Sequence, residues 1–436
     1  MVKGADLWYT TIMKKLCILF ALLLLMGCGA RQGTDGPIAF IPGETSAVKT
    51  AAAAATAAPL FTPGPSASPV PTATPAPTAT PTPSPVPVEV KLRQYVEGMT
   101  DKEKIGQLVM FGFSGTKAVS SEFAKIMADY AVGNVILYGA NIARDDRDGG
   151  FDRCAELTKD IRAHSAASVP LLVSIDVEGG HVTRFRWRTG IVSAETLGRK
   201  DDPEAARLQF QRIATALCDV GVNVDLAPVM DVAKDPGKTM LGQRIISSDP
   251  EVASRMGAAC IEGLQMGGCL SVVKHFPGHG ATTVDSHDVT PVVKKSLADL
   301  ESYELVPFEG AVAAGADGVM VAHILYPEID PDHVATQSEI IIHDILRGDM
   351  GFEGLVMADD FRMKGLRSQA SLDEAAVRFI LAGGDLILCG ANHDYQRTIL
   401  KGLADAVADG TISQERLDES VVRVLRAKMK VTDWQP

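Results

Sequence analysis

Residues 270–280 read Leu-Ser-Val-Val-Lys-His-Phe-Pro-Gly-His-Gly, a short apolar run that ends in basic side chains and glycines. A nearly continuous apolar run of this length is typical of a strand that is buried on both faces. The proline and glycines that follow favour a loop. The segment therefore predicts a buried strand that delivers polar side chains to its carboxyl end.

Seven other segments of the chain have the same character. With it, the eight runs are 108–113, 132–137, 170–175, 222–226, 270–274, 318–322, 354–357 and 385–388. Longer stretches separate them, and two of these, 203–219 and 414–429, have the apolar spacing of amphipathic helices. Eight buried strands separated by helices predict an α/β fold, a (β/α)8 TIM barrel over residues 89–436. A doubly wound open sheet is the alternative, and the count of eight favours the barrel.

Polar side chains gather where the predicted strands end. The residues at these ends are Asp176, Asp231, Lys274, His275, His323, Asp359 and Asp360. In a barrel the carboxyl ends of all strands meet at one rim, where active sites form. We therefore expect one site at this rim.

The first part of the chain has a different composition. Lys14 and Lys15 precede an apolar run, 16–26, which is too short to span a bilayer core of roughly 30 Å and suits a signal peptide. It ends in Gly-Cys28, which resembles a bacterial lipobox and predicts cleavage before Cys28 with lipid on its thiol. Met13 is an alternative start. A buried helix is disfavoured because the following residues could not bury it.

Residues 28–88 have low complexity, and 59–88 hold eleven of the 24 prolines. Such a stretch favours extended polyproline II and could reach roughly 90 Å at ~3.1 Å per residue. We therefore expect a signal peptide at 1–27, a lipid-anchored linker at 28–88 and a catalytic barrel at 89–436. This organisation places the protein on the extracytoplasmic face of a bacterial membrane, with the membrane as a partner through the lipid anchor.

Charge and cysteine content exclude other classes. The chain has 436 residues and a net charge of −12, which argues against binding nucleic acid through a basic surface. Five cysteines follow Cys28, and none forms a Cys-x-x-Cys pair. We interpret them as mostly buried thiols rather than as a disulfide framework or a metal site.

The densest chemical motif follows the fifth predicted strand. Residues 274–287 contain three histidines, one lysine and Asp285. Asp285 lies two residues before His287 and could hydrogen-bond its imidazole, which would fix the tautomer and raise the basicity. A metal site or a plain polar loop is the alternative. The chain has no His-Glu-x-x-His motif, and we favour a catalytic loop.

Three other motifs carry candidate site residues. Asp359 ends the seventh strand and could act as a nucleophile at the barrel mouth, whereas Asp360 should point elsewhere and cap the next helix. Alternatively both are capping residues. In residues 175–184, Asp176 and Arg184 could bind sugar hydroxyls. Arg244 lies in a loop, and a single arginine in a loop does not by itself indicate a function.

Together these motifs resemble glycoside hydrolase family 3, and within it the β-N-acetylhexosaminidase branch. That branch reads K-H-F-P-G-H-G…D-S-H, I-D-x-E-G-G-R-V-x-R, A-H-x-x-Y-P and S-D-D-L-x-M. The matching residues are 274–280 with 285–287, 176–184, 322–327 and 359–363. The resemblance covers about residues 90–431.

The resemblance implies a role for each matching residue. Asp359 matches the nucleophile, and His287 with Asp285 matches the acid/base pair. The positions that hold the N-acetylglucosamine ring are matched by Asp176, Arg184, Arg244, Lys274 and His275. The implied activity is retaining hydrolysis of terminal β-linked N-acetylglucosamine, with peptidoglycan fragments as the expected carbohydrate substrate. No metal or organic cofactor is implied.

The sequence departs from the branch at four positions. His181 stands where arginine is usual, Ala358 replaces serine, and Phe361-Arg362 replaces Leu-Ser. None of these changes removes a catalytic group, but they leave specificity open. The alternatives are a family 3 β-glucosidase-like enzyme, an N-acetylglucosaminide phosphorylase that uses the neutral histidine base, a non-catalytic wall-binding protein and a metal hydrolase.

Overall fold

The computed structural model describes residues 87–142, 150–185, 190–286 and 288–436. The expected signal peptide, Cys28 and nearly all of the expected linker lie outside the described residues, and so does His287. The first described helix begins at Val88, next to the expected start of the catalytic domain. Within the described ranges, no helix is both long enough and apolar enough to cross a membrane.

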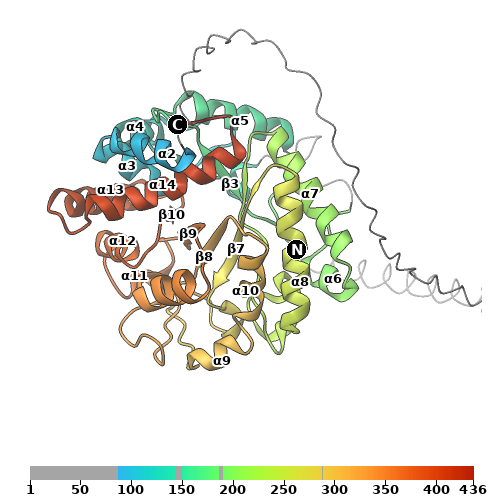
Figure 1. Cartoon of the computed structure of the whole chain (residues 1–436). Coiled ribbons are helices and arrows are strands. Elements are labelled where there is room, and N and C mark those ends of the chain that lie inside the picture. The colour runs from blue at the N-terminus through green and yellow to red at the C-terminus, as the bar shows by residue number, and fades with distance from the viewer. Residues whose placement is uncertain (1–86, 143–149, 186–189, 287) are drawn as a thin grey trace, which may run out of the picture. The chain divides into compact units, whose positions relative to one another are not determined.

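The predicted (β/α)8 barrel is confirmed. Eight parallel strands close on themselves, with β1 hydrogen-bonded to both β2 and β10 (Figure 1). Each of the eight apolar runs overlaps one of these strands. They are β1 (Val109–Gly112), β2 (Asn134–Ile136), β3 (Leu172–Ile175), β6 (Val224–Asp225), β7 (Leu270–Phe276), β8 (Gly318–Val321), β9 (Leu355–Ala358) and β10 (Leu386–Cys389).

Helices fill the connections between the strands, as the amphipathic stretches predict. They are α2 (Val88–Glu97), α3 (Asp101–Gln107), α4 (Ser121–Tyr130), α5 (Phe151–Ala163), α6 (Ala194–Lys200), α7 (Pro203–Asp219), α8 (Pro250–Met266), α9 (Leu297–Glu301), α10 (Val306–Ala313), α11 (Lys364–Arg367), α12 (Leu372–Leu381), α13 (His393–Ala408) and α14 (Gln414–Val431). Short 3-10 segments are η1 (Gly139–Asn141), η2 (Pro236–Lys238), η3 (Gly242–Arg244), η4 (His279–Ala281) and η5 (Ala335–Gln337), and η6 (Ile340–Asp349) is π-helical.

Local sequence explains where the long helices begin. Both α7 and α8 start at an Asp-Pro pair, in which the aspartate side chain accepts hydrogen bonds from backbone N–H groups of the first turn. Proline at the first helical position loses no hydrogen bond there. The two helices then pack side by side on the outside of the barrel (Figure 1).

The loop after β3 forms a small hairpin that the sequence did not predict. Its strands are β4 (Val177–Gly179) and β5 (Val182–Thr183), which pair antiparallel outside the barrel sheet. Two glycines with positive φ, Gly179 and Gly180, make its turn. The hairpin begins directly after Asp176 and carries Glu178, so it sets the position of two acidic side chains at the barrel rim.

The barrel interior is closed at the amino-terminal ends of the strands by α14. Val424 and Ala427 of this helix belong to the same apolar cluster as the inward-facing residues of all eight strands. Ser420 donates a hydrogen bond to Asp385, the residue before β10, and Lys430 pairs with Asp317, before β8. The C-terminal helix therefore seals one end of the barrel, and the opposite end stays open for a site.

We predict that Leu386→Ala destabilises the fold by about 2–5 kcal/mol, because Leu386 is fully buried inside the barrel and its truncation leaves a cavity. Urea unfolding followed by circular dichroism measures the change. Leu208→Ala is the matched control, since Leu208 is 46% exposed on α7 and should change stability by less than about 0.5 kcal/mol. Equal losses in the two variants would contradict the assigned interior.

Candidate active site

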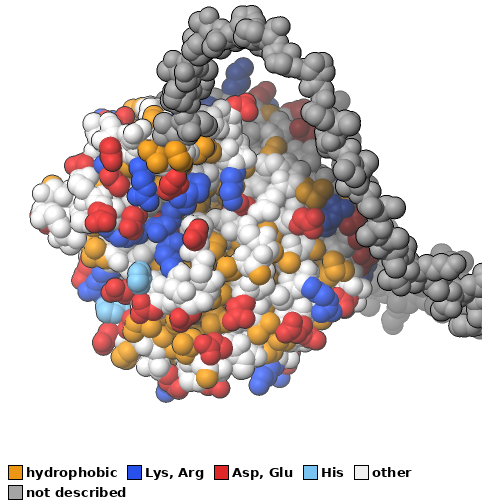
Figure 2. Space-filling model, viewed as in Figure 1, with side chains coloured by type: hydrophobic (Ala, Val, Ile, Leu, Met, Phe, Trp, Pro, Cys, Tyr) orange, Lys and Arg blue, Asp and Glu red, His pale blue; other side chains and the backbone are white. Residues whose placement is uncertain are grey.

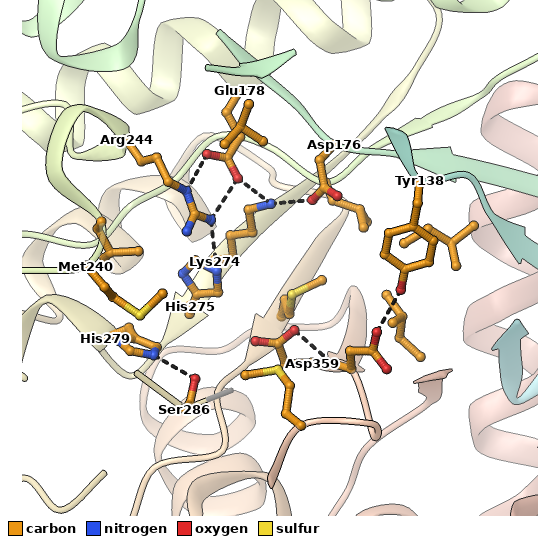
Figure 3. Close-up of a pocket in the computed structure, with 18 of the residues that line it drawn as sticks. Tyr138, Asp176, Glu178, Met240, Arg244, Lys274, His275, His279, Ser286 and Asp359 are labelled. Atoms are coloured by element: carbon orange, nitrogen blue, oxygen red, sulfur yellow. Dashed lines mark hydrogen bonds and ion pairs between the residues drawn. The ribbon is translucent and has the colours of Figure 1, made fainter. Parts of the chain in front are cut away.

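A cavity of about 330 Å³ opens at the carboxyl ends of the barrel strands (Figure 3). Its charged and polar lining comes from the ends of β2, β3, β7 and β9, from the β4–β5 hairpin, from η3 and from the loop after β7, which includes η4. These lining residues are Tyr138, Asp176, Glu178, Arg184, Arg244, Lys274, His275, His279, Ser286, Asp359, Asp360 and Arg362. A polar cavity thus lies at the expected rim, and its role as the active site stays a prediction.

One wall of the cavity is a continuous chain of ion pairs. Lys274 Nζ lies 2.7 Å from Asp176 Oδ1 and 2.7 Å from Glu178 Oε1. Arg184 Nη2 lies 2.8 Å from the second oxygen of Asp176. Arg244 makes a bidentate pair with Glu178, through Nε at 2.7 Å and Nη2 at 2.8 Å. Both carboxylates thus bridge two cations, which fixes their orientation toward the cavity.

These pairs control the protonation of the acids. Burial by itself would raise the pKa of Asp176 and Glu178, but the neighbouring cations outweigh it. Lys274 and Arg184 hold the pKa of Asp176 well below its usual range, and Lys274 and Arg244 lower the pKa of Glu178 to about 2. At neutral pH both groups are carboxylates that can accept hydrogen bonds from sugar hydroxyls.

Asp225 shows what burial does to a carboxyl that forms no ion pair among the described residues. This carboxyl at the end of β6 is fully buried and accepts one hydrogen bond, from the Val177 N–H at 2.8 Å. Among the described residues its second oxygen has no hydrogen-bond partner. Burial raises the pKa of Asp225 well above its usual value. The cations, and not the position at the rim, therefore keep Asp176 and Glu178 ionised.

His275 is held by Asp231, which lies beyond β6. Asp231 Oδ2 lies 2.7 Å from His275 Nδ1 and also accepts from the His275 backbone N–H at 3.1 Å. Its other oxygen accepts from the His279 N–H at 2.6 Å. With Nδ1 facing a carboxylate, the other ring nitrogen points toward Arg244, whose Nη2 lies 3.4 Å away. The Lys274–His275 peptide bond is cis.

The loop after β7 is anchored to the cavity by His279. This buried imidazole places Nε2 2.9 Å from the Ser286 hydroxyl, and burial lowers its pKa. Ser286 lies between Asp285 and His287. Asp285 is half-buried on the same loop, and His287 is outside the described residues. The expected geometry of the Asp285–His287 pair therefore remains a prediction.

Asp359 and Asp360 follow β9 and have different surroundings. Asp359 lines the cavity, and its Oδ1 accepts from the Asp360 N–H at 2.7 Å. The backbone carbonyl of Asp359 lies 3.2 Å from His323 Nε2. His323 is fully buried, its Nδ1 lies 2.8 Å from the Thr336 hydroxyl, and burial lowers its pKa. A neutral His323 that donates to the Asp359 carbonyl satisfies both contacts and fixes the backbone beneath the proposed nucleophile.

Asp360 is committed to structural partners. It accepts from the Tyr138 hydroxyl at 2.8 Å, from Arg362 Nη2 at 2.6 Å and from the Gly390 N–H at 3.1 Å. The prediction that Asp360 points away from Asp359 agrees with these contacts. The prediction that it caps the next helix is wrong, because the cap residue of α11 is Met363, which is followed by Lys364.

The structure brings together all five residues expected to hold the sugar ring, and Asp359 lies in the same cavity. It also adds residues that the motifs did not assign, among them Glu178, Tyr138 and His279. Glu178 could have been found, because it lies two residues after Asp176 in extended backbone and so faces the same side. Tyr138 carries no motif, and its role depends on Asp360, 222 residues later.

The departures from the family pattern lie at different depths. His181 is exposed on the hairpin turn, whereas Ala358 and Phe361 are fully buried. Arg362 lines the cavity and places its guanidinium 5.1 Å from the Tyr138 ring centre. Among the described residues, no group of three or more His, Cys, Asp or Glu side chains is arranged to hold a metal ion.

Comparison with known proteins shows which family and which relatives this chain is similar to. The profile of a family described as "Glycosyl hydrolase family 3 N terminal domain" matches residues 100–427. A β-hexosaminidase from Stenotrophomonas maltophilia is 34% identical over 288 residues, which are 64% of this chain and 82% of the relative. A β-hexosaminidase from Xylella fastidiosa is 35% identical over the same length and the same shares.

Solved structures that are similar to this chain also include family 3 enzymes. A family 3 β-N-acetylglucosaminidase from Paenibacillus sp. FPU-7 superimposes with a TM-score of 0.72 and 37% identity. The match covers 76% of this chain and 63% of that chain, so the present chain spans less than two thirds of that protein. A β-N-acetylhexosaminidase from Beutenbergia cavernae has a TM-score of 0.69 and 29% identity, over 76% of this chain and 99% of that one.

We predict that Glu178 stabilises the protein in a pH-dependent way. Its folded pKa of about 2 lies below the unfolded value of about 4.3, so its contribution is present above pH 4.3 and is lost as the pH falls toward 2. At pH 7, Glu178→Gln leaves Lys274 and Arg244 without this partner and should cost about 3–5 kcal/mol. Urea unfolding at several pH values from 7 to 3 should show that the difference in free energy of unfolding between the original protein and Glu178→Gln becomes smaller below pH 4.3.

The matched control is Glu195→Gln, which removes a surface partner of Arg199 with a side chain that is 39% exposed. It should change stability by less than about 0.5 kcal/mol at any of these pH values. A Glu178→Gln penalty that stays constant between pH 7 and pH 3 would show that the ion pairs do not control this carboxylate.

Proposed function

The chain belongs to glycoside hydrolase family 3 and is a glycoside hydrolase, and from this premise we propose that it is a retaining exo-β-N-acetylglucosaminidase. The observation that carries the proposal is the position of Asp359, whose carboxylate lines the same small cavity as the Asp176–Lys274–Glu178–Arg244 network. A nucleophile and a set of fixed hydroxyl-binding groups around one cavity are what cleavage of a terminal sugar requires.

The cavity supports removal of one terminal sugar. Its volume of about 330 Å³ is near the lower limit for small-molecule sites and suits a single ring. Lys274 is fully buried at the base of this network, between two carboxylates. Its fixed charge pairs need no reorganisation when the substrate binds, which favours charge-assisted hydrogen bonds to ring hydroxyls. We assign ring binding to this network and to Arg184, Arg244 and His275.

The reaction is proposed to occur in two steps. In the first, a carboxylate oxygen of Asp359 forms a bond to the anomeric carbon while the bond to the leaving oxygen breaks, and protonated His287 gives that oxygen its proton. In the second, His287 takes a proton from water, the water oxygen bonds to the anomeric carbon, and the Asp359 ester bond breaks. Asp285 is proposed to stabilise the imidazolium form of His287.

The polar contacts around Asp359 favour this assignment. Its Oδ1 accepts from the Asp360 N–H, and its carbonyl lies against the buried His323. The first contact holds the carboxylate and the second holds the backbone of Asp359 at the edge of the cavity. Asp360 is paired with Arg362 and accepts from Tyr138 and the Gly390 N–H, and these contacts make it a weak nucleophile.

The natural substrate follows from the expected organisation of the chain. A lipid on Cys28 and a stiff linker over residues 28–88 would hold the enzyme outside the cytoplasmic membrane. Fragments of peptidoglycan with terminal β-linked N-acetylglucosamine occur there. We therefore propose such fragments as the carbohydrate substrate and the lipid anchor as the link to the membrane.

We predict a preference for the nitrophenyl β-N-acetylglucosaminide over the nitrophenyl β-glucoside, because the proposed site is built for the N-acetyl sugar. Release of nitrophenol by the purified protein measures kcat/KM for both substrates. Assays with and without inorganic phosphate test phosphorolysis, since a neutral histidine base does not repel a phosphate nucleophile. A preference for the glucoside would refute the proposed specificity, and glucosamine-1-phosphate derivatives as main products would refute hydrolysis.

We predict that Asp359→Ala lowers kcat by at least roughly 10⁴-fold on every substrate, because the covalent step is lost. Asp360→Ala should lower kcat less, since it releases Tyr138 and Arg362 but leaves the nucleophile in place. Nitrophenol release under single-turnover conditions compares the two variants. Full activity in Asp359→Ala with none in Asp360→Ala would reverse the assignment.

A further inference from the structure

A second concavity lies at the opposite end of the barrel from the proposed active site. It has a volume of about 600 Å³ and is formed by α14, the first helix α2, η6 and the loops before β9 and β10. Five arginines line it: Arg93, Arg347, Arg416, Arg423 and Arg426. Figure 2 shows basic side chains gathered over the face where α14 lies in Figure 1. The whole chain carries a net charge of −12, so this face differs in sign from the protein as a whole.

The floor of this concavity is one buried carboxylate shared by three guanidinium groups. Asp385 is fully buried at the start of β10. Its Oδ2 lies 2.6 Å from Arg347 Nη2, and its Oδ1 lies 3.2 Å from Arg423 Nη1 and 3.8 Å from Arg416 Nη2. One negative charge thus faces three positive charges, in a place where water screens them poorly.

The three arginines differ in how many hydrogen-bond and ion-pair partners they have. Arg347 also donates to the carbonyls of Gly383, Phe352 and Gly354. Arg416 donates to two further carbonyls and pairs with Glu419 at 3.3 Å. Arg423 is 22% exposed, and among the described residues its hydrogen bond to Asp385 is the one it makes. Its remaining N–H groups can therefore serve a ligand in the concavity.

The rim adds two more cations. Arg426 Nη2 lies 2.8 Å from Glu89 Oε1 of α2, and Arg93 Nη2 lies 3.5 Å from the same oxygen. Both side chains are well exposed, at 40% and 60%. Glu89 and Glu353 offset part of the charge at the rim, and Glu419 offsets the charge of Arg416. At the floor, Asp385 is left to face both Arg347 and Arg423.

We propose that this concavity, between α14, α2 and the loops before β9 and β10, is a binding site for a phosphate group. Guanidinium forks match the tetrahedral oxygens of phosphate, which accepts several hydrogen bonds and carries up to two negative charges. The volume exceeds that of a free phosphate ion and leaves space for groups attached to it. The phosphate comes either free from solution or as the headgroup of an anionic lipid.

The electrostatics of the floor favour a further negative charge there. Burial lowers the pKa of Arg347 and Arg416, and the charge of Arg423 lowers both further, although Asp385 acts in the opposite direction. A bound phosphate would relieve this repulsion between the three arginines. The site shares no residue with the cavity around Asp359, so the proposal is independent of the proposed glycosidase mechanism.

The test is calorimetric titration of the purified protein with inorganic phosphate, together with flotation on vesicles of phosphatidylglycerol and of phosphatidylcholine. The variants are Arg423→Gln and Arg426→Gln. Each variant should raise the Kd for phosphate by at least about tenfold, or lower the preference for phosphatidylglycerol over phosphatidylcholine by the same factor. Loss of phosphate binding identifies a free ion as the source, and loss of the vesicle preference alone identifies a lipid headgroup.

The matched control is Arg397→Gln, because Arg397 is 45% exposed and pairs with Glu122 much as Arg426 pairs with Glu89. It should leave both readouts unchanged. If Arg423→Gln unfolds because Asp385 loses a partner, the exposed Arg426→Gln decides the outcome. Absence of binding to both probes, or equal binding by Arg426→Gln and the original protein, would overturn the proposal. Nitrophenol release should stay unchanged in Arg426→Gln.

Discussion

The site depends on the buried amine of Lys274, held between Asp176 and Glu178. An ammonium group that is fully buried is stable only if carboxylates replace its water. Asp176 and Lys274 are 98 residues apart in the chain. Asp176 directly follows β3 and Lys274 lies in β7, and β6 lies between these two strands in the sheet. The three charges therefore meet only when the barrel is correctly formed, and this wall of the cavity is a consequence of closure.

Each end of the barrel holds a cluster of buried ion pairs around one central charge, and the central charge is positive at one end and negative at the other. At the open rim, Lys274 is shared by two carboxylates, and Arg184 and Arg244 complete the pairs. At the sealed end, Asp385 is shared by three arginines and by the hydroxyl of Ser420. The first arrangement is nearly balanced in charge, which suits a neutral sugar. The second leaves guanidinium groups in excess, which suits an anion.

Much of the fold could be predicted because barrel strands are buried on both faces. Such strands appear in the sequence as continuous apolar runs, and all eight were identified within a few residues of their observed ends. The β4–β5 hairpin could not be predicted, since its short strands contain Glu178 and glycines instead of an apolar run. Its two glycines lie against the loop before α6, because a Cβ on Gly179 would come within 2.3 Å of the Val192 carbonyl oxygen and one on Gly180 within 2.8 Å of Ser193 Cβ. The fold brings this loop to the hairpin.

The residues of the candidate site could be predicted where they belong to a sequence motif. They could not be predicted where their surroundings depend on partners from distant strands of the barrel. Asp359 and Asp360 are adjacent and chemically identical, and chain direction alone says that they point to different sides. Their surroundings differ because Tyr138, Arg362 and the Gly390 N–H contact Asp360. A carboxylate whose lone pairs serve a cation and two further donors is less able to attack carbon. The choice between two neighbouring acids therefore rests on an aromatic residue after β2 and a glycine after β10, which only the closed barrel brings to the same carboxylate.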